Sequence, residues 1–336
     1  MIEAVRNLGE YALKKNNKST NDPLKILIDD PANRNSKGIL FILFDFDDKE
    51  KEFKYKGVEV EEYSKEKLGK YLYKKGSPNG TDITPTAMVT EIEKTFNIKI
   101  INWFKNYSSN GNSKNEIIPN IYSSLQKNKE KILQDLKEKS TVENNIISIK
   151  IDSQYPGDYG FLKNILVNSS TEKYFKKFGK ISKSQNNLCS VCQENRDEVY
   201  GFVSSFNFYT VDKPGFVSGG FRQENAWKNY PVCLNCALTL EEGKKYLADY
   251  LSFNFYGFRY LLIPKFIKST SREQEKDIFK IIERQKDPKL RKKIIKSLTN
   301  DENELLEEMS EQKNFLNNNF LFYLAPKGFD GSVFSI

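Results

Sequence analysis

The chain carries its cysteines in two short motifs, CSVC at residues 189–192 and CLNC at residues 233–236. These are the only four cysteines among 336 residues, and the sequence contains no histidine. Each C-x-x-C turn directs two sulfurs to one point, and four thiolates suit a closed, tetrahedral Zn²⁺ site of the structural kind. The expected ligands of one structural zinc ion are Cys189, Cys192, Cys233 and Cys236.

Other uses of the cysteines are less well supported. Residues 193–232 form a longer gap than the roughly 15–20 residues usual in zinc ribbons, so we expect this gap to hold a small subdomain. Disulfides need an oxidising compartment, and a redox motif needs one pair rather than two. Cys192 and Glu194 come near the zinc-deaminase pattern, but Val232 interrupts that pattern and Cys189 would occupy the position that water needs. Structural zinc is therefore favoured, and deamination stays an alternative.

Composition argues against an integral membrane protein. Hydrophobic residues make up 38% of the chain, the mean hydropathy is −0.63, and no apolar run approaches the length of a membrane span. The N-terminus has no apolar core typical of a signal peptide, so we expect a cytoplasmic protein with reduced cysteines. Lys and Arg number 53 against 45 acids, a net charge of +8, which mildly favours a polyanionic partner.

The absence of histidine removes many kinds of catalysis. Ser-His-Asp and Cys-His catalysis and histidine-dependent nuclease chemistry each lose a required group. The run FDFDD offers Asp45, Asp47 and Asp48 after a buried strand, and such a cluster can bind Mg²⁺ in a nuclease. A solvated turn is the favoured interpretation of these acids, and a metal-dependent nuclease is the less favoured one. We expect the protein not to be an enzyme.

Hydrophobic periodicity predicts an α+β fold. We predict strands at 25–30, 39–46, 52–63, 146–152, 255–264 and 320–325. Helices are predicted at 2–15, 65–75, 87–105, 117–138, 236–251 and, as a charged stretch, 271–318. The expected domains are a mixed N-terminal α/β domain with a small sheet (1–150), a zinc-finger region (151–264) with its site at 189–236, and a helical segment (265–336) that looks cut short, its last strand lacking a partner.

Two glycine-bearing loops have basic flanks. Residues 76–81 follow Lys74 and Lys75, and residues 215–223 lie among basic and amide side chains. Backbone amides in such loops can approach a phosphate closely, and lysines supply charge. An ordinary stop after a helix is an equally good interpretation of the first loop on its own.

Several motifs resemble one known family when taken together. They are MIEAVRNLGEYAL (1–13), YLYKKGSPNGTDITPT (71–86), the cysteine block with FYTVDKPGF (208–216) and AWKNYPVCLNCALTLEEGKKYL (226–247), and FYGFRYLLIPKF (255–266). In this order they resemble the large subunit of the type I-B CRISPR interference complex, Cascade, an antiviral defence assembly. Members of that family are usually considerably longer, so the resemblance implies a short or truncated form.

The resemblance implies a non-catalytic role. Such subunits sit at the 5′ end of the crRNA, test double-stranded DNA for a protospacer-adjacent motif (PAM), help start strand separation and help recruit a helicase-nuclease. The implied partners are crRNA, the other Cascade subunits, target duplex DNA and that helicase-nuclease. A zinc-ribbon nucleic-acid-binding protein outside CRISPR is the alternative. Candidate nucleic-acid contacts in the two loops are Lys74, Lys75, Gly76, Asn79, Gly80, Lys213, Arg222, Gln223, Asn225 and Lys228.

Overall fold

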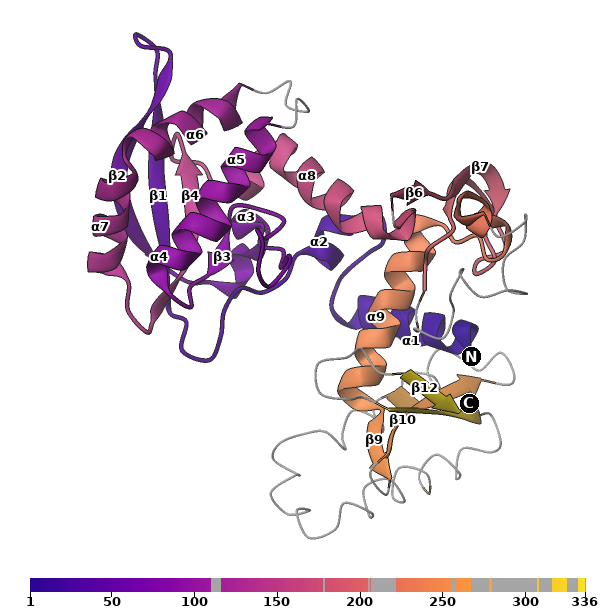
Figure 1. Cartoon of the computed structure of the whole chain (residues 1–336). Coiled ribbons are helices and arrows are strands. Elements are labelled where there is room, and N and C mark those ends of the chain that lie inside the picture. The colour runs from indigo at the N-terminus through magenta and orange to yellow at the C-terminus, as the bar shows by residue number, and fades with distance from the viewer. Residues whose placement is uncertain are drawn as a thin grey trace. The chain divides into compact units, whose positions relative to one another are not determined.

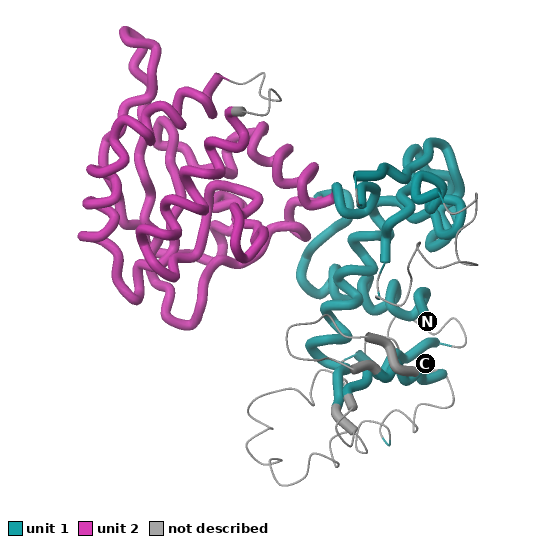
Figure 2. The backbone as a smooth tube through the Cα atoms, viewed as in Figure 1, with its two compact units in different colours: residues 1–22, 172–336 teal, residues 23–171 magenta. Residues whose placement is uncertain are grey.

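The protein is α+β, as predicted (Figure 1). The computed structural model describes residues 1–109, 116–177, 179–204, 206, 222–255, 258–266, 278–279, 307, 316–324 and 332–335. These residues form two compact units (Figure 2). Unit 1 comprises described residues of 1–22 and 172–336, and unit 2 comprises those of 23–171. This grouping cuts across the consecutive division at residues 150 and 264 that the sequence suggests, because the N-terminal helix packs with the cysteine region.

Unit 2 is built on a sheet with strand order β2-β1-β4-β3. Strand β1 runs antiparallel to β2 and parallel to β4, and the short β3 pairs antiparallel with β4. The strands are β1 (Gly38–Asp47), β2 (Glu52–Glu62), β3 (Ala87–Met88) and β4 (Asn144–Ile151). The helices are α2 (Pro23–Leu27), α3 (Leu68–Tyr71), α4 (Ile92–Thr95), α5 (Asn102–Ser109), α6 (Ile117–Lys127), α7 (Lys129–Lys139) and α8 (Gly160–Thr171).

Strand β1 is buried on both faces, which explains its nearly continuous apolar sequence, GILFILFDFD. Leu40, Ile42 and Phe44 are fully buried on one face, where α6 and α7 pack against β2 and β1. Ile39 and Phe41 alternate with them and pack on the other face against Tyr71 and Tyr155. The central strand therefore carries two layers of core.

Unit 1 contains the cysteine region and a second sheet of order β12-β11-β10-β9. Its helices are α1 (Ile2–Lys15) and α9 (Leu234–Tyr250). Its strands are β5 (Lys176–Lys177), β6 (Lys180–Ile181), β7 (Lys183–Leu188), β8 (Asn195–Tyr200), β9 (Ser252–Phe255), β10 (Phe258–Phe266), β11 (Leu316–Leu324) and β12 (Ser332–Ser335). No helix within the described ranges is both long and apolar enough to cross a membrane.

Helices α1 and α9 approach closely at two glycines. A Cβ atom added at Gly9 would lie 2.0 Å from the carbonyl oxygen of Thr239, and one added at Gly243 would lie 2.0 Å from that of Val5. Both distances are far below van der Waals contact, so only glycine fits at either position. The glycines thus allow the backbone of α1 to lie directly on α9.

The structure corrects several predicted elements. Residues 25–30 were expected as a strand, but Pro23–Leu27 form helix α2, with a proline at its first position, which favours helix initiation. The predicted helix at 87–105 begins only at Ile92, because Ala87–Met88 join the sheet as β3. The final strand is confirmed as β11, but the expectation that it lacks a partner is wrong, since β11 pairs with both β10 and β12. Most of the predicted helical stretch at 271–318 lies outside the described residues.

Candidate metal centre

The first cysteine turn joins the two strands of a hairpin. Strands β7 and β8 pair antiparallel, and residues 189–194 reverse the chain between them. The Cys189 amide donates to the carbonyl of Glu194 (2.9 Å), and the Gln193 amide donates to the carbonyl of Cys189 (2.9 Å). Gln193 takes a left-handed conformation with φ of 58°. This tight turn brings the side chains of Cys189 and Cys192 close together.

The second cysteine turn opens helix α9. Cys233 is the residue before the helix, and Cys236 lies in its first turn. Backbone hydrogen bonds join this turn to the first one: Tyr200 and Val232 exchange two of them (2.9 and 3.1 Å), and the Ser190 amide donates to the carbonyl of Pro231 (2.8 Å). The backbone alone therefore brings the two motifs together.

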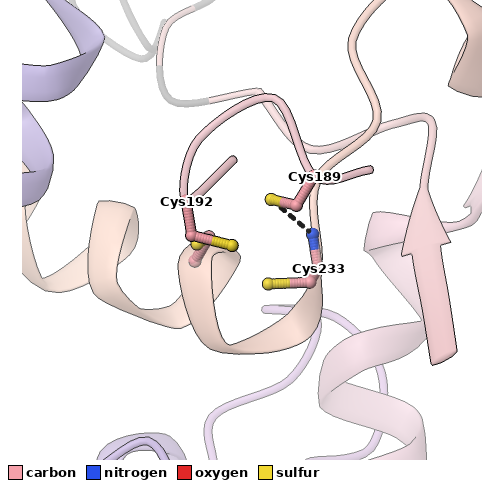
Figure 3. A group of neighbouring side chains, drawn as sticks. Cys189, Cys192 and Cys233 are labelled. Atoms are coloured by element: carbon pink, nitrogen blue, oxygen red, sulfur yellow. Dashed lines mark hydrogen bonds between the residues drawn. The ribbon is translucent and has the colours of Figure 1, made fainter. Parts of the chain in front are cut away.

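The four sulfurs converge on one point. All four Sγ atoms lie within 4.8 Å of one another, and none of the cysteines is in a disulfide. Figure 3 shows the sulfurs of Cys189, Cys192 and Cys233 turned toward one another, with the Cys233 amide donating to Cys189 Sγ at 3.3 Å. Tetrahedral zinc with bonds of about 2.3 Å would place its sulfur ligands about 3.8 Å apart. The donors therefore fit such an ion after a small contraction, and the predicted cysteine cluster is confirmed.

Electrostatics within the cluster favour one thiolate. Hydrogen bonds from the Cys233 and Cys236 thiols, and from the backbone amides of Cys192 and Cys233, lower the pKa of Cys189. The same contact with the Cys189 thiolate raises the pKa of Cys233 to about 11. Crowded thiols cannot all ionise without a cation, because like charges at this distance repel. The cluster is thus arranged to receive positive charge.

Arg196 is a neighbour of the cluster that the sequence analysis did not identify. A hydrogen bond with the Cys192 side chain is the main cause that raises the pKa of the Arg196 guanidinium. Arg196 lies on β8 and also forms an ion pair with Glu194. Outer groups of this kind orient metal ligands and offset their charge. Its position four residues after Cys192 is the one signal in the sequence that could have suggested it.

The geometry suits a closed site better than a reactive one. A hydrolytic zinc ion needs one open coordination position for water. Four sulfur ligands would fill all four positions of a tetrahedral ion. Within the described ranges, the cysteines are the one group of acidic or thiol side chains close enough to hold a metal. Asp47 instead caps the β1–β2 turn, accepting from the Lys49 amide at 2.9 Å, and pairs with Lys54 at 2.7 Å. This agrees with the favoured interpretation of the acidic run as a solvated turn.

The candidate contacts of the first loop lie in unit 2. Lys74 is paired with Asp29 (3.0 Å), and the Gly76 amide donates to the buried carboxylate of Asp82 (2.9 Å). Asp82 thus already occupies the amide that was expected to meet a phosphate, and Gly80 donates to the carbonyl of Ser77. The exposed members are Lys75 and Asn79.

The candidates of the second loop lie in unit 1, except Lys213, which lies outside the described residues. Gln223 and Asn225 belong to a 3₁₀ turn, Gln223–Lys228, and Arg222 precedes it. The buried Ser182 hydroxyl fixes this turn, donating to the carbonyl of Glu224 and accepting from the Trp227 amide, both at 3.0 Å. Arg222 and Lys228 are exposed on this rigid support.

Comparison with known protein families gives two matches in chain order. The model for the N-terminal domain of CRISPR-associated protein TM1802 matches residues 1–168, and the model for its central domain matches residues 186–329. A search of curated proteins finds no match. Together the two domain models span most of the chain, including both cysteine motifs. They confirm the resemblance to a CRISPR-associated family, and the chain belongs to the CRISPR-associated protein TM1802 family.

Proposed function

We propose that this chain is the non-catalytic large subunit of a type I-B CRISPR-Cas effector complex. In this role it recognises the PAM in target duplex DNA, helps start crRNA-guided strand separation and helps recruit the helicase-nuclease. Its partners are crRNA, the other Cascade subunits and the target DNA, and it works in the cytoplasm. The observation that carries the proposal is the pair of family matches over both the N-terminal and the central domain.

The chemistry of the chain supports a binding role. A net charge of +8 favours association with nucleic acid, and the absence of histidine removes the commonest general base. The cysteine cluster supports structural Zn²⁺, which would fix the first turn of α9 to the β7–β8 hairpin. The four cysteines would hold this ion, and its contribution is to folding.

Exposed residues on the two loops are the proposed DNA contacts. In the first loop they are Lys75 and Asn79, since Lys74 and Gly76 already have partners within the protein. In the second they are Arg222 and Lys228 around the 3₁₀ turn, with Gln223 and Asn225 offering amides to base edges.

The test is duplex binding by the assembled complex. The chain is reconstituted with crRNA and its partner subunits, and affinity for duplexes with and without the PAM is measured across salt concentrations. Lys75→Ala should weaken binding and lower the salt slope by about one unit per lost phosphate contact. Lys65→Ala, at another exposed lysine outside the loop, is the matched control. Equal effects of the two substitutions would remove the first loop from the interface.

The same preparation separates the alternatives. A zinc-ribbon protein outside CRISPR would bind nucleic acid but would not assemble with crRNA and the partner subunits. A deaminase or a metal-dependent nuclease would turn over single- or double-stranded DNA in the presence of Zn²⁺, Mg²⁺ or Mn²⁺. Failure to assemble, or turnover by the isolated chain, would overturn the proposal.

A further inference from the structure

A polar groove lies in unit 2, where strands β1 and β4 begin and β3 ends. Its volume is about 450 Å³, within the range of sites for small ligands. Three separate segments of the chain line it: the loop before β1, the residues after β3, and the end of α7 with the turn into β4. The lining includes Asn33, Lys137, Thr141, Val142 and Asn145.

Three side-chain acceptors of this lining are already used within the protein. Asn33 Oδ1 accepts from the Asn35 amide (2.8 Å), and Asn145 Oδ1 accepts from the Ser36 hydroxyl (2.6 Å). Thr141 Oγ1 accepts from two backbone amides, those of residues 143 (3.2 Å) and 144 (2.9 Å). A ligand that donates hydrogen bonds would compete with these internal donors at all three side chains.

The lining also offers donors, although the Asn145 side-chain amide already donates to the carbonyl of Val142 at 2.9 Å. The Thr141 hydroxyl accepts twice and still has its proton to give, because a hydroxyl is one donor and two acceptors. Among the described residues, the side-chain amide of Asn33 donates only to the sulfur of Met88, at 3.8 Å. Lys137 adds a positive charge, and no carboxylate belongs to the lining. The groove is therefore suited to a ligand rich in acceptors and negatively charged.

Apolar side chains complete the groove. Val142 projects into solvent with 72% of its surface exposed, although a valine is normally buried. With Val89 and Ile92 it provides an apolar wall beside the donors. A ligand with one flat apolar part and one anionic part would satisfy both sides.

Lys137 forms an exposed ion pair with Glu93. Lys137 Nζ lies 2.9 Å from Glu93 Oε2, and both side chains are about half exposed (51% and 54%). Exposed ion pairs of this kind contribute little and are screened by salt. A phosphate can therefore take over Lys137, and Glu93 acts against it by competition.

We propose that this groove binds one nucleotide of a single-stranded nucleic acid. The phosphate would meet Lys137, Thr141 and Asn33, and the base would lie against Val142 and its apolar neighbours. The hydrogen-bond donors of the lining are the reason to expect an anionic ligand with acceptor atoms. The choice of a nucleotide among such ligands rests on the proposed function.

The test compares three variants of the full chain. Binding of a fluorescein-labelled oligothymidylate and of the matching oligouridylate is followed by anisotropy over a range of salt concentrations. Lys137→Ala should weaken binding roughly tenfold and reduce the salt slope by about 0.7. Glu93→Gln should tighten binding roughly twofold to fivefold, because it releases Lys137. Lys131→Ala, an exposed lysine on the same helix α7, should leave binding unchanged.

The opposite signs of the two groove variants keep the test independent of stability. If Lys137→Ala and Lys131→Ala have equal effects, or if Glu93→Gln weakens binding, the proposal is overturned. Thymidine monophosphate should displace the oligonucleotide better than inorganic phosphate at equal concentration. Equal competition would show a simple phosphate site and refute the nucleotide. Failure of the large-subunit role is seen separately, as failure to assemble with crRNA and partner subunits.

Discussion

The contact between α1 and α9 yields the sharpest stability prediction, the effect of Gly243→Ala. In most helix interiors this change stabilises, because alanine has a helix propensity about 1 kcal/mol better than glycine. Here the new Cβ would lie 2.0 Å from the carbonyl oxygen of Val5 and 3.0 Å from its carbonyl carbon. The substitution therefore combines a gain in helix propensity with a steric overlap, and the two change stability in opposite directions.

Steric overlap should dominate. Real Cβ atoms essentially never come within 3.0 Å of another heavy atom, so the helices must separate by at least about 1 Å from the present 2.0 Å. The atom that is struck belongs to the backbone and cannot rotate away. Overpacking of a well-packed core costs about 1–3 kcal/mol, and the rigid partner places this case near the upper end. After the gain in propensity, Gly243→Ala should destabilise unit 1 by about 1–2 kcal/mol.

Urea unfolding of the full chain measures this effect. The chain has two tryptophans, Trp103 in unit 2 and Trp227 in unit 1. In a Trp103→Phe background, tryptophan fluorescence therefore reports unit 1 alone. The control is Gly69→Ala in helix α3 of unit 2, where an added Cβ meets nothing within 4 Å, and it is followed through Trp103 in a Trp227→Phe background. A variant Gly243→Ala that is as stable as the parent, or more stable, would refute the close approach of the two helices.

Two further predictions concern the cysteines and a buried carboxylate. Cys233→Ser should lower bound zinc from near one equivalent per chain and lower the melting temperature sharply, since metal binding is coupled to folding; metal analysis and calorimetry check this. Burial raises the pKa of Glu61, but hydrogen bonds from Lys67, Lys150 and the Tyr155 hydroxyl outweigh it and lower the pKa from 4.5 to about 2. The stabilisation by ionised Glu61, about 1 kcal/mol after solvent screening, is present above pH 4.5 and lost as the pH falls toward 2. Glu61→Gln should therefore be less stable than the parent at neutral pH, with a difference that shrinks below pH 4.5 and vanishes below pH 2, and a constant difference in urea unfolding across that range would contradict the assignment.

What the sequence predicted well was local in character. The run that became β1 is apolar at nearly every position because both faces of the strand are covered, and such a run indicates a buried strand directly. The cysteine cluster was predictable because each motif fixes two ligands within four residues. Residues 25–30 misled, because a short apolar run fits a strand and a helix equally well, and Pro23 then favoured the helix.

What the sequence could not show depends on distant segments meeting. Gly9 and Gly243 carry no signal of their contact, since each is merely a glycine within a helical pattern. The groove of unit 2 draws its donors from three separate segments, so Asn33, Thr141 and Lys137 gave no common motif. The loop at Gly76 likewise looked open to phosphate until Asp82 was found to accept its amide.

The cysteine centre and helix α1 act on the same element, helix α9. Cys233 and Cys236 fix the start of α9, while Gly243 receives the backbone of α1 further along it. Helix α1 also reaches the first cysteine turn itself, since Arg6 Nη1 donates to the carbonyl of Val191 at 3.3 Å. Loss of the proposed zinc ion would remove one link between the start of α9 and the turn that Arg6 contacts, and the backbone hydrogen bonds between the two turns would remain. The N-terminal helix therefore belongs to the cysteine unit because it contacts both helix α9 and the first cysteine turn.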